Sequence, residues 1–153
     1  MAHIKVQTED FDVSAEIAAL TSERTDIGGI GCFVGTVRAD ARTDRPAVVG
    51  MTLEHYPGMT ERAIARIADQ AAERWPLLGC TVIHRVGPLR PGENIVLVIA
   101  TSAHRQAALD ATGFLIDWLK TKAPFWKRED FADGGGAWVE AREDDDAAAS
   151  RWG

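Results

Sequence analysis

The chain has 153 residues, 46% hydrophobic and 26% charged, with a formal net charge of −6 at pH 7. This length fits one domain, and no apolar stretch approaches the roughly 18 residues that span a bilayer. The acidic balance argues against a nucleic-acid-binding protein, which needs a broad basic surface, but it allows a small anionic ligand.

The first residues, MAHIKVQTEDF, contain no basic segment leading into an apolar run. No secretory signal is indicated, so we expect a cytoplasmic location. The following segment has apolar residues at Val13, Ile17 and Leu20. This spacing predicts a short helix with Asp12 or Ser14 as its N-cap.

The glycine-rich segment GGIGCFVGTV predicts an apolar strand, and a polar loop, ADARTDRP, follows Arg38. A dinucleotide-binding turn needs its glycines between a strand and a helix, whereas here the next predicted element is another strand. We therefore interpret Gly31 and Gly35 as positions where another backbone or a ligand approaches the strand closely.

The middle of the chain predicts three strands and a helix. VVGMTLEHY alternates as a strand, and CTVIHRVG and NIVLVIATS form a strand pair joined by the turn residues of PLRPGE. Between them, Pro57-Gly58 predicts a turn and Thr60 is expected to cap a helix that Pro76 ends. One face of that helix carries the apolar residues Ile64, Ile67, Ala71 and Trp75.

A second long helix is expected to begin with Ser102 as its cap and to end at Ala123-Pro124. AWVEA predicts a last strand, and the acidic segment after it predicts a frayed end. The order, roughly βαββαββαβ, indicates an α+β (mixed α/β) fold with an antiparallel-rich sheet packed by two or three helices. We expect one catalytic domain over residues 1–141 and an acidic tail over 142–153.

Cys32 and Cys80 are the only cysteines, and no Cys-x-x-Cys or Cys/His cluster surrounds them. Neither a disulfide framework nor a metal site is supported. We interpret both as small buried hydrophobic residues in strands, and we expect no metal and no cofactor.

Two places carry cations suited to an anion. His104 and Arg105 fall in the first turn of the second long helix, where cations are normally unfavourable unless a negative ligand is shared. Arg38, at the end of the glycine-rich strand, has a guanidinium that can bind a carboxylate or phosphate, although a solvated surface arginine is an equally good interpretation. We interpret the other histidines, His3, His55 and His84, as structural.

The stretch LKTKAPFWKRE places four cations, Lys120, Lys122, Lys127 and Arg128, around a proline and two aromatic residues. Lys120 suits the negative end of the helix dipole, so helix capping is its simplest role. Pro124 breaks the helix, and burial of Phe125 and Trp126 would turn the chain back and bring Lys127 near Lys120. Two close ammonium groups walled by rings lower each other's pKa, which suits proton transfer or nucleophilic attack.

The two groups of cations, His104 with Arg105 and Lys120 with Lys127, lie at opposite ends of the predicted helix. A continuous helix puts His104 and Lys120 roughly 24 Å apart at about 1.5 Å per residue. They cannot flank one small substrate within one chain. Either they are unrelated, or a two-fold dimer brings the start of one helix to the end of its mate, and we favour the dimer.

Five sequence segments, in this order over nearly the whole chain, are similar to those of one family: LEHYPGMTE (53–61), VIHRVG (82–87), SAHR (102–105), LKTKAPFWKRE (119–129) and WVEA (138–141). Together they resemble the large, catalytic subunit of molybdopterin synthase, which has a hammerhead-like fold. The resemblance implies sulfur transfer from the thiocarboxylated C-terminal Gly-Gly of a small ubiquitin-like subunit to cyclic pyranopterin monophosphate. It also implies a homodimer of large subunits at the core of a heterotetramer.

The resemblance assigns roles residue by residue. Lys120 and Lys127 match the family's essential lysines and are the expected catalytic residues. The expected substrate-binding residues are Thr36, Val37, Arg38, His104, Arg105, Lys120, Lys127, Arg128 and Glu129. No cysteine is needed, because the sulfur arrives on the partner.

Two other functions stay open. The lysines could serve only as charge complement in a non-catalytic module that docks an acidic or ubiquitin-like tail. A cysteine-based sulfurtransferase is the other alternative, and it would need Cys32 or Cys80.

Overall fold

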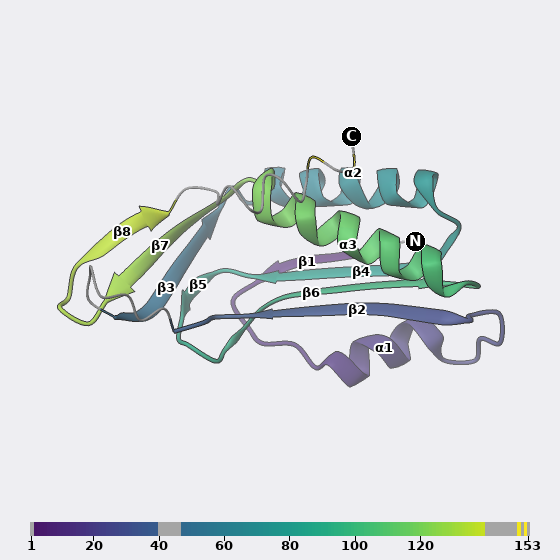
Figure 1. Ribbon diagram of the computed structural model, residues 1–153, viewed down its shortest axis with the longest axis horizontal. Helices are drawn as coiled ribbons and strands as arrows, with labels where there is room; N and C mark the ends of the chain where they lie inside the picture. The colour runs from purple at the N-terminus through teal and green to yellow at the C-terminus, as the bar shows by residue number, and fades with distance from the viewer. Residues whose placement is uncertain (1, 40–46, 140–149, 151, 153) are drawn as a thin grey trace.

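A computed structural model gives the structure of the chain and describes residues 2–39, 47–139, 150 and 152. Figure 1 shows the arrangement of its helices and strands. In chain order these are β1 (Ala2–Gln7), α1 (Val13–Thr21), β2 (Gly29–Thr36), β3 (Val48–His55), α2 (Met59–Arg74), β4 (Leu77–Arg85), β5 (Gly87–Leu89), β6 (Asn94–Ser102), α3 (Arg105–Thr121), β7 (Phe125–Phe131) and β8 (Gly136–Val139).

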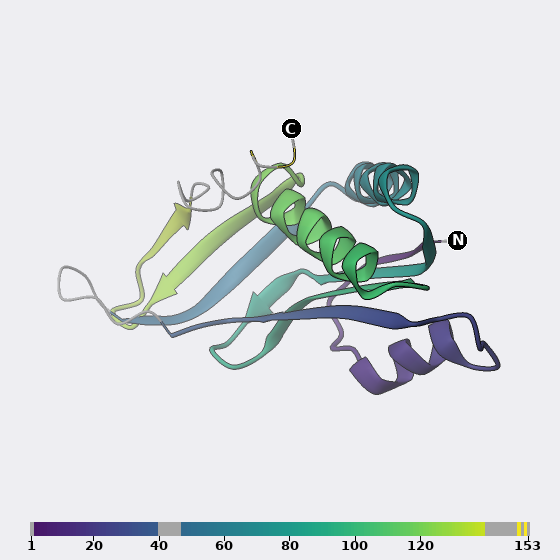
Figure 2. The same ribbon diagram turned by 45° about the vertical axis from the view of Figure 1, so that its right-hand side comes forward.

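The strands form two sheets. The first has the order β1-β4-β6-β2, in which only β1 and β4 run parallel, and the second has the order β5-β3-β7-β8 and is antiparallel throughout. Helices α2 and α3 cover one face of the first sheet and α1 lies on the other (Figures 1 and 2). The predicted α+β class, rich in antiparallel pairs and packed by helices, is confirmed.

The central strands β4 and β6 are almost continuously apolar because helices cover both of their faces. Between this sheet and α2 and α3 lies the larger core, which includes Val82, Val98, Ile64 and Leu115, all fully buried. The predicted apolar face of α2 is confirmed, since Ile64, Ile67 and Ala71 are buried and Trp75 packs against the same core.

The glycine-rich strand β2 lies at the edge of the first sheet, beneath α3. A methyl group on Gly31 would come within 2.4 Å of both the Ala108 carbonyl oxygen and the Thr112 hydroxyl. The predicted close backbone approach at Gly31 is therefore confirmed. The expectation that Cys32 is buried is wrong: its side chain is exposed, because an edge strand extends beyond the cover that α1 gives to the central strands.

Two predicted helix caps are corrected by the structure, whereas Asp12 does cap α1 by accepting the Ala15 N–H. The N-cap of α2 is Gly58, with a left-handed φ of 83°, and the Glu61 carboxylate accepts its N–H. Thr60 lies inside the helix instead. Ser102 belongs to β6, and α3 has His104 as its N-cap, because the Ser102 side chain serves to join β6 to the Pro76 carbonyl.

The structure contains two strands that the sequence did not predict. Gly87–Leu89 forms β5, which pairs with β3, within the segment expected to be part of a strand and its turn. Phe125–Phe131 forms β7, which pairs with β3 and β8. Alternation along β7 turns Trp126 outward, so the expected burial of its ring is wrong, and it stacks edge-on with Tyr56 at the surface.

Residues 40–46, which include most of the predicted polar loop, and most of the predicted tail at 142–153 lie outside the described residues. Across the described part of the chain, no helix is both long enough and apolar enough to cross a membrane.

Candidate active site

Lys120 is an exposed residue in the last turn of α3, where its charge complements the helix dipole. The helix ends because the Lys122 and Ala123 N–H groups both turn back to the Trp118 carbonyl oxygen, and Pro124 offers no N–H to continue. The chain enters β7 at the next residue. The helix stop predicted at Ala123-Pro124 is therefore confirmed.

Strand β7 sorts the remaining residues of the stretch onto two faces. Its register sets Lys127 opposite Leu53 and Glu129 opposite Met51. Both partners are buried, and Lys127 is accordingly half-buried and Glu129 7% exposed. The intervening Arg128 is exposed on the other face, 3.5 Å from the Asp130 carboxylate.

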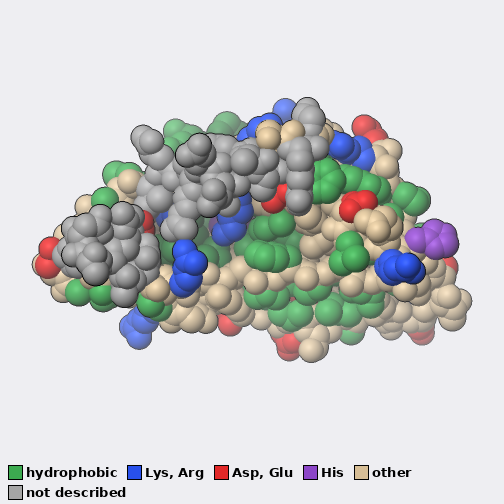
Figure 3. All heavy atoms as spheres, in the orientation of Figure 1, with side chains coloured by type: hydrophobic (Ala, Val, Ile, Leu, Met, Phe, Trp, Pro, Cys, Tyr) green, Lys and Arg blue, Asp and Glu red, His purple; other side chains and the backbone are tan. Residues whose placement is uncertain are grey.

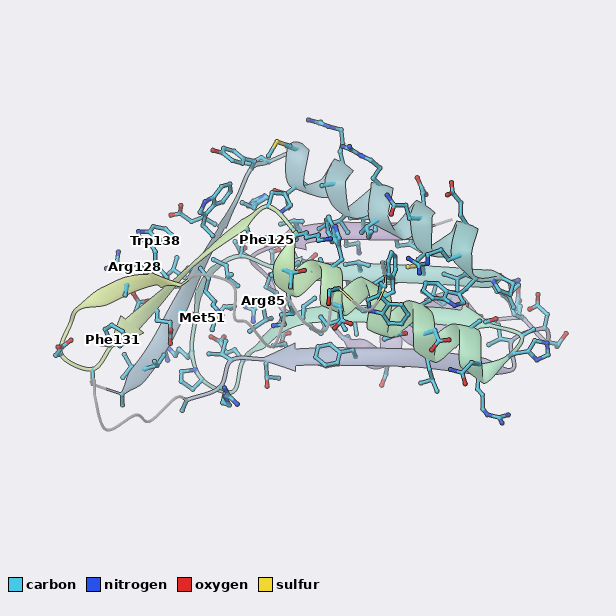
Figure 4. The ribbon with its side chains drawn as sticks, turned by 45° about the horizontal axis from the view of Figure 1, so that its top comes forward. Met51, Arg85, Phe125, Arg128, Phe131 and Trp138 are labelled. Carbon is cyan, nitrogen blue, oxygen red and sulfur yellow. The ribbon has the colours of Figure 1, made fainter. Side chains whose placement is uncertain are left out.

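Figure 4 shows Phe125 where β7 begins, beside the end of α3, and Arg128 and Trp138 next to one another farther along the sheet. The register agrees, since Arg128 pairs with Trp138 of β8. On the space-filling surface, several Lys and Arg side chains occupy the half of the face where α3 meets the second sheet, with hydrophobic side chains between them (Figure 3). This face therefore carries cationic and apolar side chains among one another.

Below Lys120 lies a buried histidine. The ring of His84, in β4, stacks on that of Phe125 with 3.9 Å between centroids and 20° between planes. Burial lowers the pKa of His84 to about 4, against the hydrogen bond to the Arg85 carbonyl, and the charges of Lys120 and His55 lower it further. Lys120 is therefore within electrostatic range of His84.

Arg38 lies at the same end of the molecule as Lys120. Strand β2 and α3 run side by side, with Gly29 against Arg105 at one end, so the end of β2 lies toward the end of α3 (Figures 1 and 2). Thr36 ends the strand and is exposed, whereas Val37 is buried and exchanges backbone hydrogen bonds with Glu93 and Gly92. This pairing with the turn before β6 fixes the backbone from which the exposed Arg38 projects.

His104 and Arg105 lie at the opposite end of α3. Both are exposed, and the His104 side chain caps nothing, since only its N–H reaches the Ser102 hydroxyl at 3.4 Å. Helix α3 is continuous over Arg105–Thr121, so its ends are about 24 Å apart. Within one chain the structure does not bring this pair to Lys120.

In the part of the chain that the structure describes, burial is what shifts the pKa of both cysteines. Cys80 is buried as predicted, and burial raises its pKa to about 11; burial also raises the pKa of Cys32. Both changes disfavour the thiolate that nucleophilic attack requires. In the described ranges, no group of three or more His, Cys, Asp and Glu residues is arranged to hold a metal ion.

Two residues close to the site were not predicted for it. His84 was interpreted as structural, and Thr60 as a helix cap. The only indication of such a role in the sequence was their presence in VIHRVG and LEHYPGMTE, two of the segments that carry the family resemblance.

Comparison with known proteins gives consistent matches. The family model described as MoaE protein matches residues 6–122. The chain is 57% identical over 150 residues to a molybdopterin synthase catalytic subunit from Mesorhizobium japonicum, covering 97% of this chain and 92% of that protein. It is 50% identical to the solved structure of a molybdopterin biosynthesis MoaE protein from Burkholderia ambifaria, with a TM-score of 0.81, covering 99% of this chain and 98% of that one.

A more distant structure shares the fold. It is a complex of subunits 1 and 2 of molybdopterin-converting factor from Helicobacter pylori, 20% identical, with a TM-score of 0.70. The match covers 92% of this chain and 90% of that chain.

Proposed function

This chain belongs to the MoaE protein family, and on that basis we propose that it is the large, catalytic subunit of a molybdopterin synthase. It takes sulfur from the thiocarboxylated C-terminus of a small ubiquitin-like subunit and transfers it to cyclic pyranopterin monophosphate, forming the dithiolene of molybdopterin. The enzyme is therefore a sulfurtransferase. The relative from Mesorhizobium japonicum carries the name of this catalytic subunit, and the distant structural neighbour is a complex of two subunits.

One observation carries the assignment of the site. The charge of Lys120, at the end of α3, acts on buried His84, and Lys127 lies on the same face of β7 as Phe125, whose ring stacks on His84. Lys120 is exposed and accessible to an incoming tail, whereas Lys127 is half-buried on a strand. Such a pair offers one cation to meet an anionic peptide and a second to act deeper in the site.

The chemistry needs cations at two stages. The thiocarboxylate sulfur attacks a side-chain carbon of the pterin and forms a carbon–sulfur bond, while the carbon–oxygen bond at that carbon breaks and its oxygen leaves with a proton or on the phosphate. Hydrolysis then breaks the acyl–sulfur bond, so the partner leaves as a carboxylate and the sulfur stays on the product. The dithiolene needs two such transfers, each from one thiocarboxylate. Lys120 orients or protonates the thiocarboxylate, and Lys127 stabilises developing negative charge or shuttles a proton.

The phosphate of the substrate needs its own cations. Arg38 projects at the same end as Lys120, with Thr36 and Val37 beside it. Arg128 and Glu129, on opposite faces of β7, are assigned to other parts of the substrate. His104 and Arg105 come from a second copy of the chain, because the length of α3 separates them from Lys120 in their own chain. The protein is thus a homodimer with a small subunit bound at each end.

Reconstitution tests the proposal. The purified chain is mixed with thiocarboxylated small subunit and cyclic pyranopterin monophosphate, and the dithiolene product is measured. Lys120→Ala and Lys127→Ala should each abolish product without unfolding the protein. Lys122→Ala is the matched control, because Lys122 is an exposed lysine two residues from Lys120 at the helix C-cap. Wild-type rates in both test variants would exclude catalysis by these lysines.

In the docking alternative Lys120 has no catalytic role. Its position in the last turn of α3 is then explained by its favourable interaction with the helix dipole alone. Lys120→Arg separates the two functions. Docking tolerates the change because the charge is kept, whereas proton transfer does not, because a guanidinium is effectively never deprotonated. A cysteine-based mechanism instead requires Cys32→Ser or Cys80→Ser to lose activity, and we expect both to keep it because neither thiol favours its thiolate.

A further inference from the structure

His84 is a polar residue in the apolar interior of the protein. It lies on the face of β4 that α2 and α3 cover, since Cys80 and Val82, four and two residues earlier, belong to the larger core. Only 7% of it is exposed. A histidine buried at this depth is expected to have a role that an aliphatic residue could not fill.

The hydrogen bonding of His84 fixes both its orientation and its tautomer. Its Nδ1 lies 2.8 Å from the carbonyl oxygen of Arg85, in its own strand. A carbonyl oxygen only accepts, so Nδ1 carries the proton and, in the neutral ring, Nε2 does not. The ring is therefore held in one plane, which a Leu or Val side chain could not reproduce.

The fixed ring supports the segment between the two lysines. Phe125, which stacks on His84, is five residues after Lys120 and two residues before Lys127. It also lies on the same face of β7 as Lys127, because successive side chains of a strand alternate. Because Phe125 is the first residue of β7, the packing of its ring on His84 anchors the start of β7 beside the end of α3.

Burial keeps the ring neutral, and the charges around it act in the same direction. Lys120 approaches from α3 and His55 from β3, where the His55 ring is 6.5 Å from Phe125. A proton on His84 would have to be buried, and it would be repelled by each of these two groups whenever that group is charged. A neutral ring, by contrast, packs beneath Lys120 without opposing its charge.

We propose that His84 is a positioning residue of this active site: its neutral ring, oriented by the Arg85 carbonyl, holds Phe125 in place and so fixes Lys127 relative to Lys120. This inference rests on the proposed function of the two lysines. His84 itself contacts no reacting atom, and it acts through Phe125.

The test is a double-mutant cycle on the two stacked rings, read by single-turnover sulfur transfer. His84→Ala removes the ring, His84→Phe keeps a flat ring but not the hydrogen bond, and Phe125→Leu removes the other member of the stack. His84→Ala should slow sulfur transfer by about 10- to 100-fold, as misplacement of a catalytic group does. The affinity for the small subunit should stay unchanged, and His84→Phe should recover part of the rate.

The cycle distinguishes positioning from general destabilisation. If His84 acts through Phe125, the double variant His84→Ala/Phe125→Leu loses no more than the worse single variant. Multiplying losses would overturn the inference, as would a wild-type rate in folded His84→Ala. His3→Ala is the control, because His3 is an exposed histidine on the neighbouring strand β1.

Two further outcomes keep the test decisive. If His84→Ala does not fold, wild-type rates in both His84→Phe and Phe125→Leu overturn the inference, and a loss in either supports it. The proposed function fails separately: it falls if Lys120→Ala and Lys127→Ala keep their rates. Loss in those variants with a wild-type rate in His84→Ala removes only the role of His84.

Discussion

The hydroxyl of Thr60 donates a hydrogen bond to the carbonyl oxygen of Pro124, with 3.1 Å between the two oxygens. The same hydroxyl oxygen accepts the N–H of Tyr56 at 3.0 Å. One fully buried side chain of α2 thereby joins the turn before that helix to the residue before β7. The segment between Lys120 and Lys127 is held from the helical side by Thr60 and from the sheet by His84.

Thr60→Val should both destabilise the protein and slow sulfur transfer. Valine keeps the shape but leaves the Pro124 carbonyl and the Tyr56 N–H without this partner, which costs about 1 to 3 kcal/mol. Urea unfolding measures the stability, and single-turnover product formation measures the rate. Thr101→Val is the matched control, because Thr101 is equally buried and its hydroxyl donates to the Gly79 carbonyl within the first sheet. Equal losses of rate in the two variants would contradict a specific role for Thr60.

Acidification should weaken the fold through His84. Burial, above all, lowers its pKa from 6.5 to about 4, so the unfolded chain takes up this proton first as the pH falls. The stabilisation is complete above about pH 6.5 and is lost as the pH falls toward 4, amounting to about 3 kcal/mol at most.

Urea unfolding of the wild type and of His84→Phe at pH 7 and pH 4.5 measures this effect. The phenylalanine variant lacks the titrating group, so its stability should fall less between the two values. Asp10 and Asp26, whose hydrogen bonds lower their pKa values, contribute equally to both proteins and cancel. An equal loss in both proteins would show that folding does not lower the pKa of His84.

The elements that sequence predicted well are those whose signal is local. The face of Ile64, Ile67 and Ala71 repeats at helical spacing, and Pro124 ends a helix wherever it lies. Strand β7 carries four consecutive charged residues, Lys127 to Asp130, so its alternation becomes apparent only against Leu53 and Met51 of β3. Pairing across more than 70 residues leaves no local pattern to detect.

The site divides in the same way. Lys120, Lys127 and Arg38 stand out as cations in an acidic chain, and the family resemblance assigns them roles. Thr60 and His84 act through contacts with residues 64 and 41 positions away, Pro124 and Phe125. Each has an ordinary local interpretation as a cap or a buried strand residue, and only the folded chain shows what it supports.

Trp152→Ala should destabilise the protein, although the acidic end of the chain was expected to be frayed. The Trp152 indole donates to the Asp117 carboxylate at 2.6 Å, and its ring lies edge-on to Trp75 and Phe114. Loss of these contacts should cost about 1 to 3 kcal/mol in urea unfolding. Trp138→Ala is the control, because Trp138 is 59% exposed. Unchanged stability in Trp152→Ala would show that the terminal residues do not stay on the core.

Mixing two inactive variants tests whether the site is shared between subunits. Lys120 and Arg105 are about 22 Å apart along α3, so one substrate can contact both only if they come from different chains. In a mixed dimer of Lys120→Ala and Arg105→Ala chains, one site then carries both substitutions and the other carries none. Co-expression in equal amounts should restore about a quarter of the wild-type rate, because half of the dimers are mixed and one of their two sites is intact. Each parent dimer serves as the inactive control in the same assay. If the mixture stays as inactive as its parents, His104 and Arg105 do not complete the site of a second copy, and their role must be sought within their own chain.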